Sequence, residues 1–395
     1  MVVQLAKNIY WVGVVDWNLR HFHGYELSTH RGSSYNAYLI LDRDLTLVDT
    51  VWTPFQEELI ENIRELIDPS KIRYVVANHS EADHSGALPR VMEFAQDATV
   101  IVSTNGLKSI PGHYHKDWKF QAVKTEDRIN IGENDLVFVE APMLHWPDSM
   151  FTYLPKPAIL MPNDAFGQHY ATAYRYNDQV NQNELYEEAQ KYYANILTPF
   201  SRLVLQKIEE VLAMKLPVNM ICPSHGVIWR KDPLQIVTQY QKWAAQDAQP
   251  RAVVVFDTMW QATRKMAEAI GEGLADGGVD HKLFHMAVTD RNDVISEVLI
   301  SKAVLIGSPT VNMGVLPTIA PFLEDLVHLR FQNKMGAAFG SYGWSGESVE
   351  RIEDCLKKAK IDIIHEALRC NWQPGDADLE ACIQFGKEVA KKIIS

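Results

Sequence analysis

The chain has 395 residues and a formal net charge of −12, with 47% hydrophobic and 22% charged residues. This composition is typical of folded globular proteins and excludes extensive disorder, and the length predicts two or three domains. The negative charge would repel nucleic-acid phosphates and anionic lipids, so we expect neither nucleic acid nor a membrane as a partner. We find neither an apolar run of membrane-spanning length nor a secretory signal, which favours a cytoplasmic location.

The residues before the small polar stretch 244–250 predict a mixture of short strands and helices, as in an α+β or sandwich architecture. Short apolar runs predict strands at 8–15, 35–41, 45–48, 72–77, 99–103, 129–131, 136–140, 158–161 and 218–221. The second and third of these runs form a predicted hairpin. Helical periodicity predicts helices at 54–67, 183–214 and 233–243.

After this stretch, strands and helices alternate regularly. We expect strands at 252–256, 281–285, 303–306, 334–339 and 361–364, and helices at 263–275, 294–301, 317–327, 347–358 and 376–394. Five such units predict a doubly wound parallel sheet, which binds ligands beyond the carboxyl ends of its strands. The stretch 244–250 is therefore the predicted boundary between a domain of residues 1–248 and a domain of residues 251–395.

Four metal-ligating side chains follow the predicted strand 72–77 within six positions: His79, Glu81, Asp83 and His84. Alternate spacing can direct the first two one way and the last two another, which suits two adjacent ions better than one. The alternative is a solvated polar loop.

Three further candidates, His145, Asp164 and His225, each follow a predicted strand. Each one alone is more typical of a structural residue, but together they would meet at one rim. Four histidines and three carboxylates without cysteine favour non-haem iron or manganese, although zinc stays open. The cysteines form no Cys-x-x-Cys pair, and we expect them to be free thiols of a reducing compartment: Cys222, Cys355, Cys370 and Cys382.

The pattern His79-x-Glu81-x-Asp83-His84, followed by His145, Asp164 and His225, resembles the metallo-β-lactamase-like domain of flavodiiron proteins. Zinc hydrolases of that superfamily usually have histidine where this chain has Glu81. The resemblance implies an αββα sandwich with His79, Glu81 and His145 on one iron. It implies Asp83, His84 and His225 on the other iron and Asp164 as the bridge, with His84 the least secure ligand. Residues that could surround the open face of the metals are His23, Tyr25 and His169; they could equally be ordinary surface or packing residues.

The predicted strand 252–256 leads into a hydroxyl-rich loop and then a helix, an arrangement that can hold a phosphate without a lysine. Two more loops, 307–312 and 340–346, are rich in glycine and hydroxyl groups. Each loop alone could be a tight turn, but together they resemble the FMN site of flavodoxins. The implied contacts are Thr258, Met259, Trp260, Gln261 and Thr263 at the phosphate, and Ser308, Pro309, Thr310, Asn312, Ser341, Tyr342, Gly343 and Trp344 around the ring.

The resemblance implies a reductase in which electrons pass through FMN to two non-haem irons, reducing O2 to water, NO to N2O, or both. It implies a head-to-tail homodimer or a dimer of such dimers. Because no further redox domain follows the last predicted helix, we expect an external donor, either rubredoxin or reduced coenzyme F420. The alternatives are a zinc-dependent hydrolase fused to a flavodoxin-like module, and an electron carrier or oxygen sensor without turnover.

Overall fold

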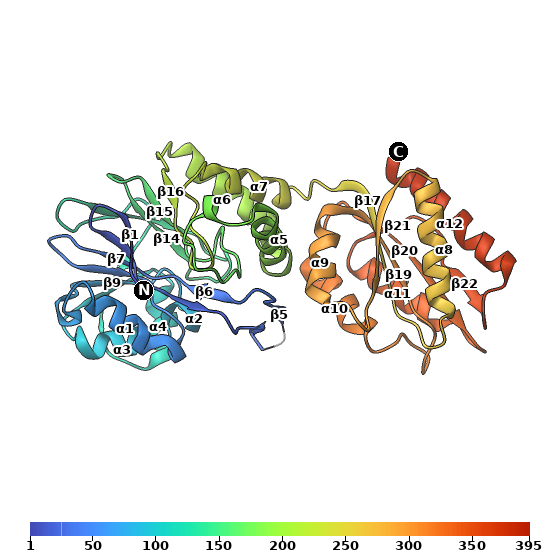
Figure 1. The fold of residues 1–395 in the computed structure, drawn as a ribbon, viewed down its shortest axis with the longest axis horizontal. Coiled ribbons are helices and arrows are strands. Elements are labelled where there is room, and N and C mark those ends of the chain that lie inside the picture. The colour runs from blue at the N-terminus through green and yellow to red at the C-terminus, as the bar shows by residue number, and fades with distance from the viewer. Residues whose placement is uncertain (25) are drawn as a thin grey trace. The chain divides into compact units, whose positions relative to one another are not determined.

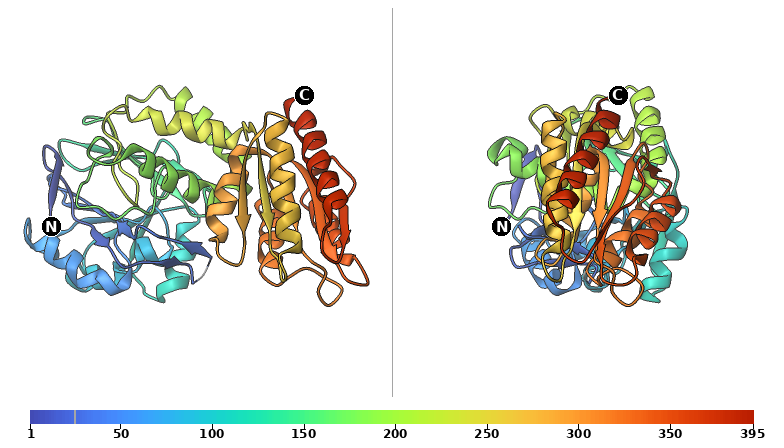
Figure 2. Two further views of the ribbon diagram at one scale, coloured as in Figure 1. Left: turned by 45° about the vertical axis from the view of Figure 1, so that its right-hand side comes forward. Right: turned by 90° about the vertical axis from the view of Figure 1, so that its right-hand side faces the viewer.

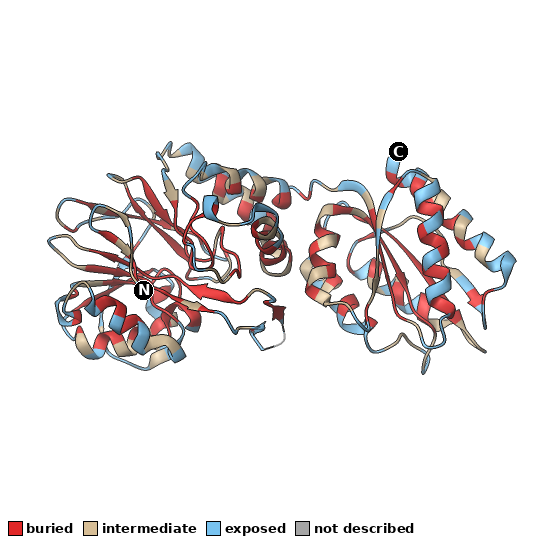
Figure 3. Cartoon of the chain, viewed as in Figure 1, coloured by how far each residue is buried: buried red, intermediate tan, exposed pale blue. Residues whose placement is uncertain are grey.

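The computed structural model describes residues 1–24 and 26–395, and the chain divides into two compact units. The first unit contains Met1–Tyr192 and Arg202–Gln241, and the second contains Tyr193–Ser201 and Lys242–Ser395. Buried residues concentrate on the strands and on the inner faces of the helices within each unit (Figure 3). No helix of the described residues is long and apolar enough to cross a membrane.

Two sheets form the centre of the first unit. The seven-stranded sheet has the order β1 (Val3–Ala6), β2 (Ile9–Trp11), β7 (Tyr38–Ile40), β8 (Thr46–Val48), β9 (Tyr74–Val76), β10 (Thr99–Ser103) and β11 (Lys119–Val123). The five-stranded sheet has the order β12 (Arg128–Asn130), β13 (Asp135–Glu140), β14 (Met150–Leu154), β15 (Ile159–Met161) and β16 (Met220–Ile221). Buried side chains of both sheets, such as Trp11 and Phe138, share one hydrophobic core.

Helices cover the outer faces of the two sheets. Figure 1 shows α1 (Gln56–Arg64), α3 (Leu88–Phe94) and α4 (Gly106–Tyr114) along the seven-stranded sheet. It shows α6 (Ser201–Ala213) and α7 (Leu234–Ala244) along the five-stranded sheet, with α5 (Gln182–Tyr192) close to them. The arrangement is the predicted αββα sandwich, and β7 pairs with β8 in the predicted hairpin. Two short pairs complete it: β3 (Val14–Asp16) with β6 (Ser33–Tyr35), and β4 (His21–Phe22) with β5 (Leu27–Ser28).

The prediction of one strand over residues 8–15 was wrong. Strand β2 ends at Trp11 and β3 begins at Val14. The intervening Gly13 lies so close to the backbone of Tyr35 that a Cβ would meet the Tyr35 carbonyl oxygen at 2.2 Å. At this point the chain leaves the seven-stranded sheet, and β3 pairs with β6.

The predicted helical stretch over residues 183–214 is present, but its helix type changes along the way. Helix α5 ends at Tyr192, a π-helical turn follows at Tyr193–Leu197, and α6 begins at Ser201. Pro199 has no N–H to donate and lies in a 3-10 turn at Thr198–Phe200, so the backbone stays helical while the α-helical hydrogen-bond pattern is lost there. The change of helix type begins directly after Tyr192, whose side chain belongs to the site described below.

The second unit is a parallel sheet with the order β18-β17-β19-β20-β21, and β22 also pairs with β20. Its strands are β17 (Gln249–Phe256), β18 (Asp280–His285), β19 (Ser301–Gly307), β20 (Met335–Tyr342), β21 (Asp362–Ile363) and β22 (Leu368–Asn371). Its helices are α8 (Ala262–Asp276), α9 (Arg291–Ile300), α10 (Ile319–Leu329), α11 (Glu347–Lys358) and α12 (Asp376–Ile394). Figure 2 shows helices on both sides of the sheet, and the predicted doubly wound architecture is confirmed.

Candidate metal centre and flavin site

The seven predicted metal-ligating side chains come together at the strand ends of the sandwich. His79 follows β9, Glu81 precedes the short helix α2 (Ala82–Ser85), and Asp83 and His84 lie within that helix. The other three follow β13, β15 and β16, as the sequence predicted. Two groups of four side chains are each compact enough to hold one metal ion: His79, Glu81, His145 and Asp164, and Asp83, His84, Asp164 and His225.

Asp164 belongs to both groups, and its two oxygens face different histidines. Its Oδ2 lies 3.4 Å from His145 Nε2 and 3.8 Å from His79 Nε2. Its Oδ1 lies 2.9 Å from His84 Nε2 and 3.4 Å from His225 Nε2. A carboxylate with one oxygen toward each of two nitrogen clusters has the geometry of a bridging ligand between two cations.

The remaining carboxylates complete the groups. Glu81 Oε2 lies 3.3 Å from His79 Nε2 and 3.5 Å from His145 Nε2. Asp83 Oδ2 lies 3.0 Å from His225 Nε2 and 3.2 Å from His84 Nε2. Each predicted cluster therefore has two imidazoles, one carboxylate of its own and a share of Asp164.

The donor atoms of the second group fit a metal better than they fit each other. Both Asp83 carboxylate oxygens and the Nε2 atoms of His84 and His225 are buried and make no hydrogen bond. This holds although Asp83 Oδ2 lies within 3.2 Å of both Nε2 atoms. Buried polar atoms without a partner are rare because their desolvation is costly. These oxygen and nitrogen atoms point toward one another without forming hydrogen bonds, as expected of ligands that bind a cation between them.

The electrostatics of the site favour cations. Burial raises the pKa of Asp164, but the nearby charge of His84 and the close imidazoles of His145 and His225 hold it well below its ordinary value. Burial lowers the pKa of His225, but Asp164 and Asp83 raise it to about 10. The carboxylates thus attract positive charge strongly into a buried space, whether this charge is a proton or a metal ion.

Partners behind the ligands were not predicted. Asp148 Oδ1 lies 3.1 Å from His79 Nδ1, and the hydroxyl of Tyr192 donates to Asp164 Oδ1 at 3.0 Å. Asp148 follows His145 by three residues, and a carboxylate so close to a candidate ligand could have indicated a role at the site. Nothing in the sequence distinguished Tyr192 as a site residue, since it is one of several aromatic residues in a predicted helix.

The predicted surrounding residues have different outcomes. His23 Nε2 lies 2.7 Å from Glu81 Oε1, on the side of the carboxylate that does not face the histidines. His169 is buried, its Nδ1 lies 2.7 Å from Ser33 Oγ, and its ring centroid is 4.8 Å from that of His225. Tyr25 lies outside the described residues.

The three predicted flavin loops all leave the carboxyl ends of parallel strands, after β17, β19 and β20. Thr263 Oγ1 hydrogen-bonds Ser341 Oγ at 2.9 Å, and the Thr310 amide donates to the Ser341 carbonyl at 2.9 Å. These contacts hold the three loops together. The Thr258 hydroxyl is buried without a partner, which fits a group that would donate to a phosphate oxygen.

The outer edge of this site is unusually exposed for large aromatic rings. The exposed fraction is 80% for Trp260 and 90% for Trp344. A fourth loop, after β22, was not predicted: the Asn371 side chain donates to the carbonyls of Tyr342 and Gly343 at 3.2 and 2.8 Å, and Gln373 donates to the Trp260 carbonyl at 2.8 Å. These groups fit a flat cofactor with a buried phosphate end and an accessible ring.

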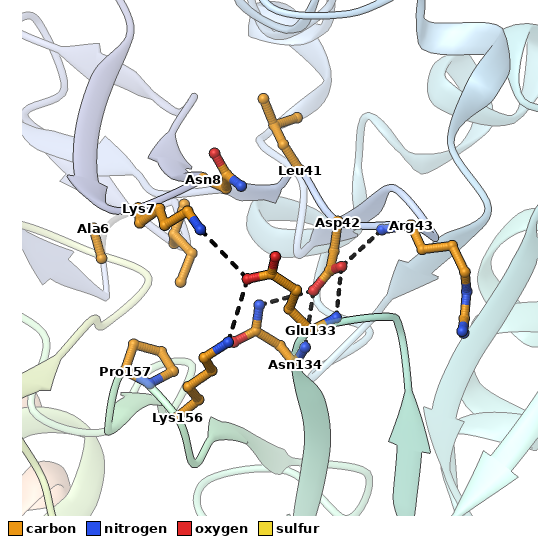
Figure 4. Close-up of a pocket in the computed structure, with 11 residues that line it drawn as sticks. Ala6, Lys7, Asn8, Leu41, Asp42, Arg43, Glu133, Asn134, Lys156 and Pro157 are labelled. Atoms are coloured by element: carbon orange, nitrogen blue, oxygen red, sulfur yellow. Dashed lines mark hydrogen bonds and ion pairs between the residues drawn. The ribbon is translucent and has the colours of Figure 1, made fainter.

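A separate pocket of about 420 Å³ lies in the first unit between the strand ends around Asn8, Leu41 and Glu133 (Figure 4). Lys7 and Lys156 both lie within 3.5 Å of Glu133 Oε2 there. None of the predicted metal ligands is among the residues that line it, so this pocket is not part of the candidate centre.

Comparison with known proteins agrees with both halves of the structure. The family described as ODP family beta lactamase matches residues 34–226, and flavodoxin matches residues 254–386. The chain is 50% identical to a nitric oxide reductase of Moorella thermoacetica, over 99% of this chain and 98% of the relative. It is 48% identical to an anaerobic nitric oxide reductase flavorubredoxin of Escherichia coli O1:K1, over 99% of this chain and 82% of that protein.

Solved structures extend the agreement to the whole chain. Rubredoxin oxygen:oxidoreductase of Desulfovibrio gigas is 37% identical with a TM-score of 0.97, covering 100% of this chain and 99% of the other. The flavodiiron protein of Giardia intestinalis is 33% identical with a TM-score of 0.95, covering 100% of this chain and 97% of the other. The chain belongs to the flavodiiron protein family.

As a flavodiiron protein, the chain is an oxidoreductase whose cofactors are FMN and a non-haem diiron centre. The family and its members' names support reduction of nitric oxide or oxygen by these cofactors. They do not favour the alternative of a zinc-dependent hydrolase.

Proposed function

We propose that this flavodiiron protein reduces nitric oxide to nitrous oxide, using electrons that pass from an external donor through FMN to the diiron centre. The observation that supports this most is the position of Asp164, whose two oxygens each face one cluster of imidazoles. The proposed ligands are His79, Glu81 and His145 for one iron and Asp83, His84 and His225 for the other, with Asp164 as the bridge.

When bound, FMN and the diiron centre supply the electron-transfer chemistry. Coupling two nitric oxide molecules consumes two electrons and two protons and gives one nitrous oxide and one water. The buried ligands hold both metal positions and exclude bulk water. Tyr192 orients Asp164 through its hydroxyl, and because burial and the Asp164 charge raise its pKa well above the ordinary value, this hydroxyl keeps its proton.

Oxygen reduction to water is the second candidate. It is favoured by the likeness to rubredoxin oxygen:oxidoreductase, which covers 100% of this chain. The relatives named nitric oxide reductases are more similar in sequence, at 50% and 48% identity, and for this reason we place nitric oxide first.

The remaining assignments are also proposals. FMN binds at the four loops after β17, β19, β20 and β22, with its phosphate at Thr258 and Thr263. The domains are residues 1–248 and 251–395, which the two compact units support in outline. The protein works in the cytoplasm as a head-to-tail homodimer, in which FMN of one chain serves the irons of its partner. The donor is rubredoxin or reduced coenzyme F420; the names of two relatives, a flavorubredoxin and a rubredoxin oxygen:oxidoreductase, favour rubredoxin.

The test uses the iron-loaded and FMN-loaded protein, reduced anaerobically by a photochemical donor. Nitric oxide and oxygen are added in separate runs, and both gases and nitrous oxide are measured. We expect one nitrous oxide for every two nitric oxide molecules consumed under multiple turnover. Protein that carries two zinc ions and hydrolyses an ester, or that consumes neither gas, would overturn the proposal.

A further inference from the structure

His79 and His225, one histidine from each metal group, differ in the group that contacts their Nδ1 atoms. His79 directs Nε2 toward Glu81 and Asp164, while its other ring nitrogen, Nδ1, lies 3.1 Å from Asp148 Oδ1. In the other group, His225 Nδ1 lies 2.7 Å from the backbone carbonyl of Ser34. One imidazole is therefore backed by a carboxylate, and the other is backed by a neutral peptide group.

Asp148 is held firmly in this position. Its Oδ2 accepts hydrogen bonds from the Ser80 amide at 2.9 Å and from the Ser109 hydroxyl at 2.7 Å. Its own backbone carbonyl accepts from the Ser103 hydroxyl at 2.7 Å. These bonds leave Asp148 Oδ1 facing His79 Nδ1. The carboxylate is 3% exposed, so its effect on the imidazole is little screened by solvent.

We propose that Asp148 is a positioning residue that makes the metal position of His79, Glu81 and His145 the more strongly held of the two. The inference rests on the proposed ligand assignment. A carboxylate that accepts the Nδ1 proton fixes the tautomer whose Nε2 is free to bind the metal, and it raises the basicity of that nitrogen. The Ser34 carbonyl fixes the tautomer of His225 in the same way but adds no charge.

The asymmetry has a consequence for the redox chemistry. A more basic His79 stabilises a higher positive charge at its metal position than His225 does at the other. The two positions therefore differ in potential as well as in affinity, although their ligand types are the same. This difference arises from a residue that contacts neither metal position directly.

The test replaces Asp148 by Asn in the iron-loaded and FMN-loaded protein. Asparagine keeps the shape but removes the charge, so His79 loses its strong acceptor. Iron release to a ferrous chelator measures affinity, and anomalous scattering from crystals of the partly depleted protein measures occupancy at each position. We expect affinity to fall by about 10-fold to 100-fold at the position of His79 and His145. Occupancy beside His84 and His225, and the FMN content, should be unchanged.

Asp42→Asn is the matched control. The Asp42 carboxylate also organises a loop, by accepting from the amides of Arg43, Glu133 and Asn134 within 2.9 Å (Figure 4). It has no metal-ligand partner, so D42N should keep both irons. If D148N loses both irons equally, keeps both as the wild type does, or behaves as D42N does, the inference is overturned.

A second variant keeps the inference testable if D148N does not fold. Ser109→Ala keeps the Asp148 charge but removes one of the two hydrogen bonds that orient this carboxylate toward His79. A smaller loss at the same metal position supports the inference, and wild-type occupancy at both positions overturns it. A wild-type protein that holds fewer than two metals would instead refute the proposed diiron ligands, which separates the two failures.

Discussion

The candidate metal centre and the candidate flavin site both lie at strand ends, but they differ in how far their side chains are buried. Five of the seven proposed ligands are buried, Glu81 and His145 are partly buried, and all seven meet from four separate segments of the chain. In the proposed flavin site, the Thr258 and Thr263 hydroxyls are buried, while Trp260 and Trp344 lie largely in solvent. The proposed metal positions are therefore enclosed, and the proposed flavin site is open at its aromatic end.

The comparison teaches where the binding energy of each site resides. In the metal centre, opposite charges converge so closely that each ligand depends on the others. In the flavin site, the loops are held by hydrogen bonds between themselves, and any one contact contributes modestly. Single changes should therefore be severe in the first site and graded in the second.

Asp164→Ala should have the largest effect. It removes the carboxylate that both metal groups share and leaves four imidazoles without their central partner. We expect diiron occupancy and gas reduction to fall by more than about 100-fold, because loss of an outer partner alone costs about 10-fold to 100-fold. FMN content should stay at the wild-type level. Iron analysis and gas electrodes measure this, and Asp178→Ala, on an exposed ion pair, is the control. Unchanged turnover in D164A would contradict the bridging role.

Thr258→Val combined with Thr263→Val tests the buried end of the flavin site. The proposed phosphate contacts are the Thr258 hydroxyl, which is buried without a partner, and the Thr263 hydroxyl, which also hydrogen-bonds Ser341 Oγ. Hydrogen bonds to charged groups contribute about 1.5 to 3 kcal/mol each. We expect the dissociation constant of FMN to rise by about 100-fold, with both irons retained. Recovery of flavin fluorescence on release gives the affinity. Thr289→Val removes a hydroxyl that donates to the His285 carbonyl in the same unit, and it should leave FMN affinity unchanged. Equal affinity in the double variant and the wild type would reject the phosphate assignment.

A buried lysine of the second unit allows a test of how burial changes the pKa of a charged group. Lys334 of the second unit is 2% exposed, and its ammonium donates to the carbonyls of Leu299 and Ser301 at 2.7 Å each. Burial lowers its pKa from 10.5 to about 7. Between these values the unfolded chain binds more protons than the folded one, so stability rises with pH through this window.

Lys334→Met removes this dependence. Between about pH 7 and pH 9, the unfolding free energy of the wild type should rise by roughly 2 kcal/mol relative to the variant. Urea unfolding, followed by flavin fluorescence at both pH values, measures the difference. A difference between the two proteins that stays the same at both pH values would show that the ammonium titrates normally in the folded protein.

The sequence predicted the architecture well where periodicity was regular, as in the five strand–helix units of the flavodoxin-like domain. It failed where one residue altered the path of the chain, at Gly13, and it did not show the change of helix type before α6. It also missed β14, whose five residues are all buried, because a short continuous apolar run carries no alternation. These failures concern local backbone geometry, which periodicity averages over.

The candidate site follows the same division. The ligand types were predicted because donor atoms of the right chemistry follow predicted strands, and the structure brings all seven together. Asp148 and Tyr192 were missed because their roles depend on which ring or oxygen they face. The loop after β22 was missed because its contribution is made by backbone carbonyls and an asparagine, which carry no distinctive sequence signal.

Asn371→Ala should have the smallest effect and tests this unpredicted loop. The side chain is exposed, and its two hydrogen bonds hold the carbonyls of Tyr342 and Gly343 beside the ring site. Bonds of this kind contribute about 0.5 to 1.5 kcal/mol, so FMN affinity should fall by roughly threefold to tenfold. Asn219→Ala is the control, since Asn219 is an exposed asparagine that donates to the Pro157 carbonyl within the first unit. A loss in N371A as large as in the threonine double variant would mean that the outer loops are as tightly coupled as the metal ligands, and the contrast between the two sites would fail.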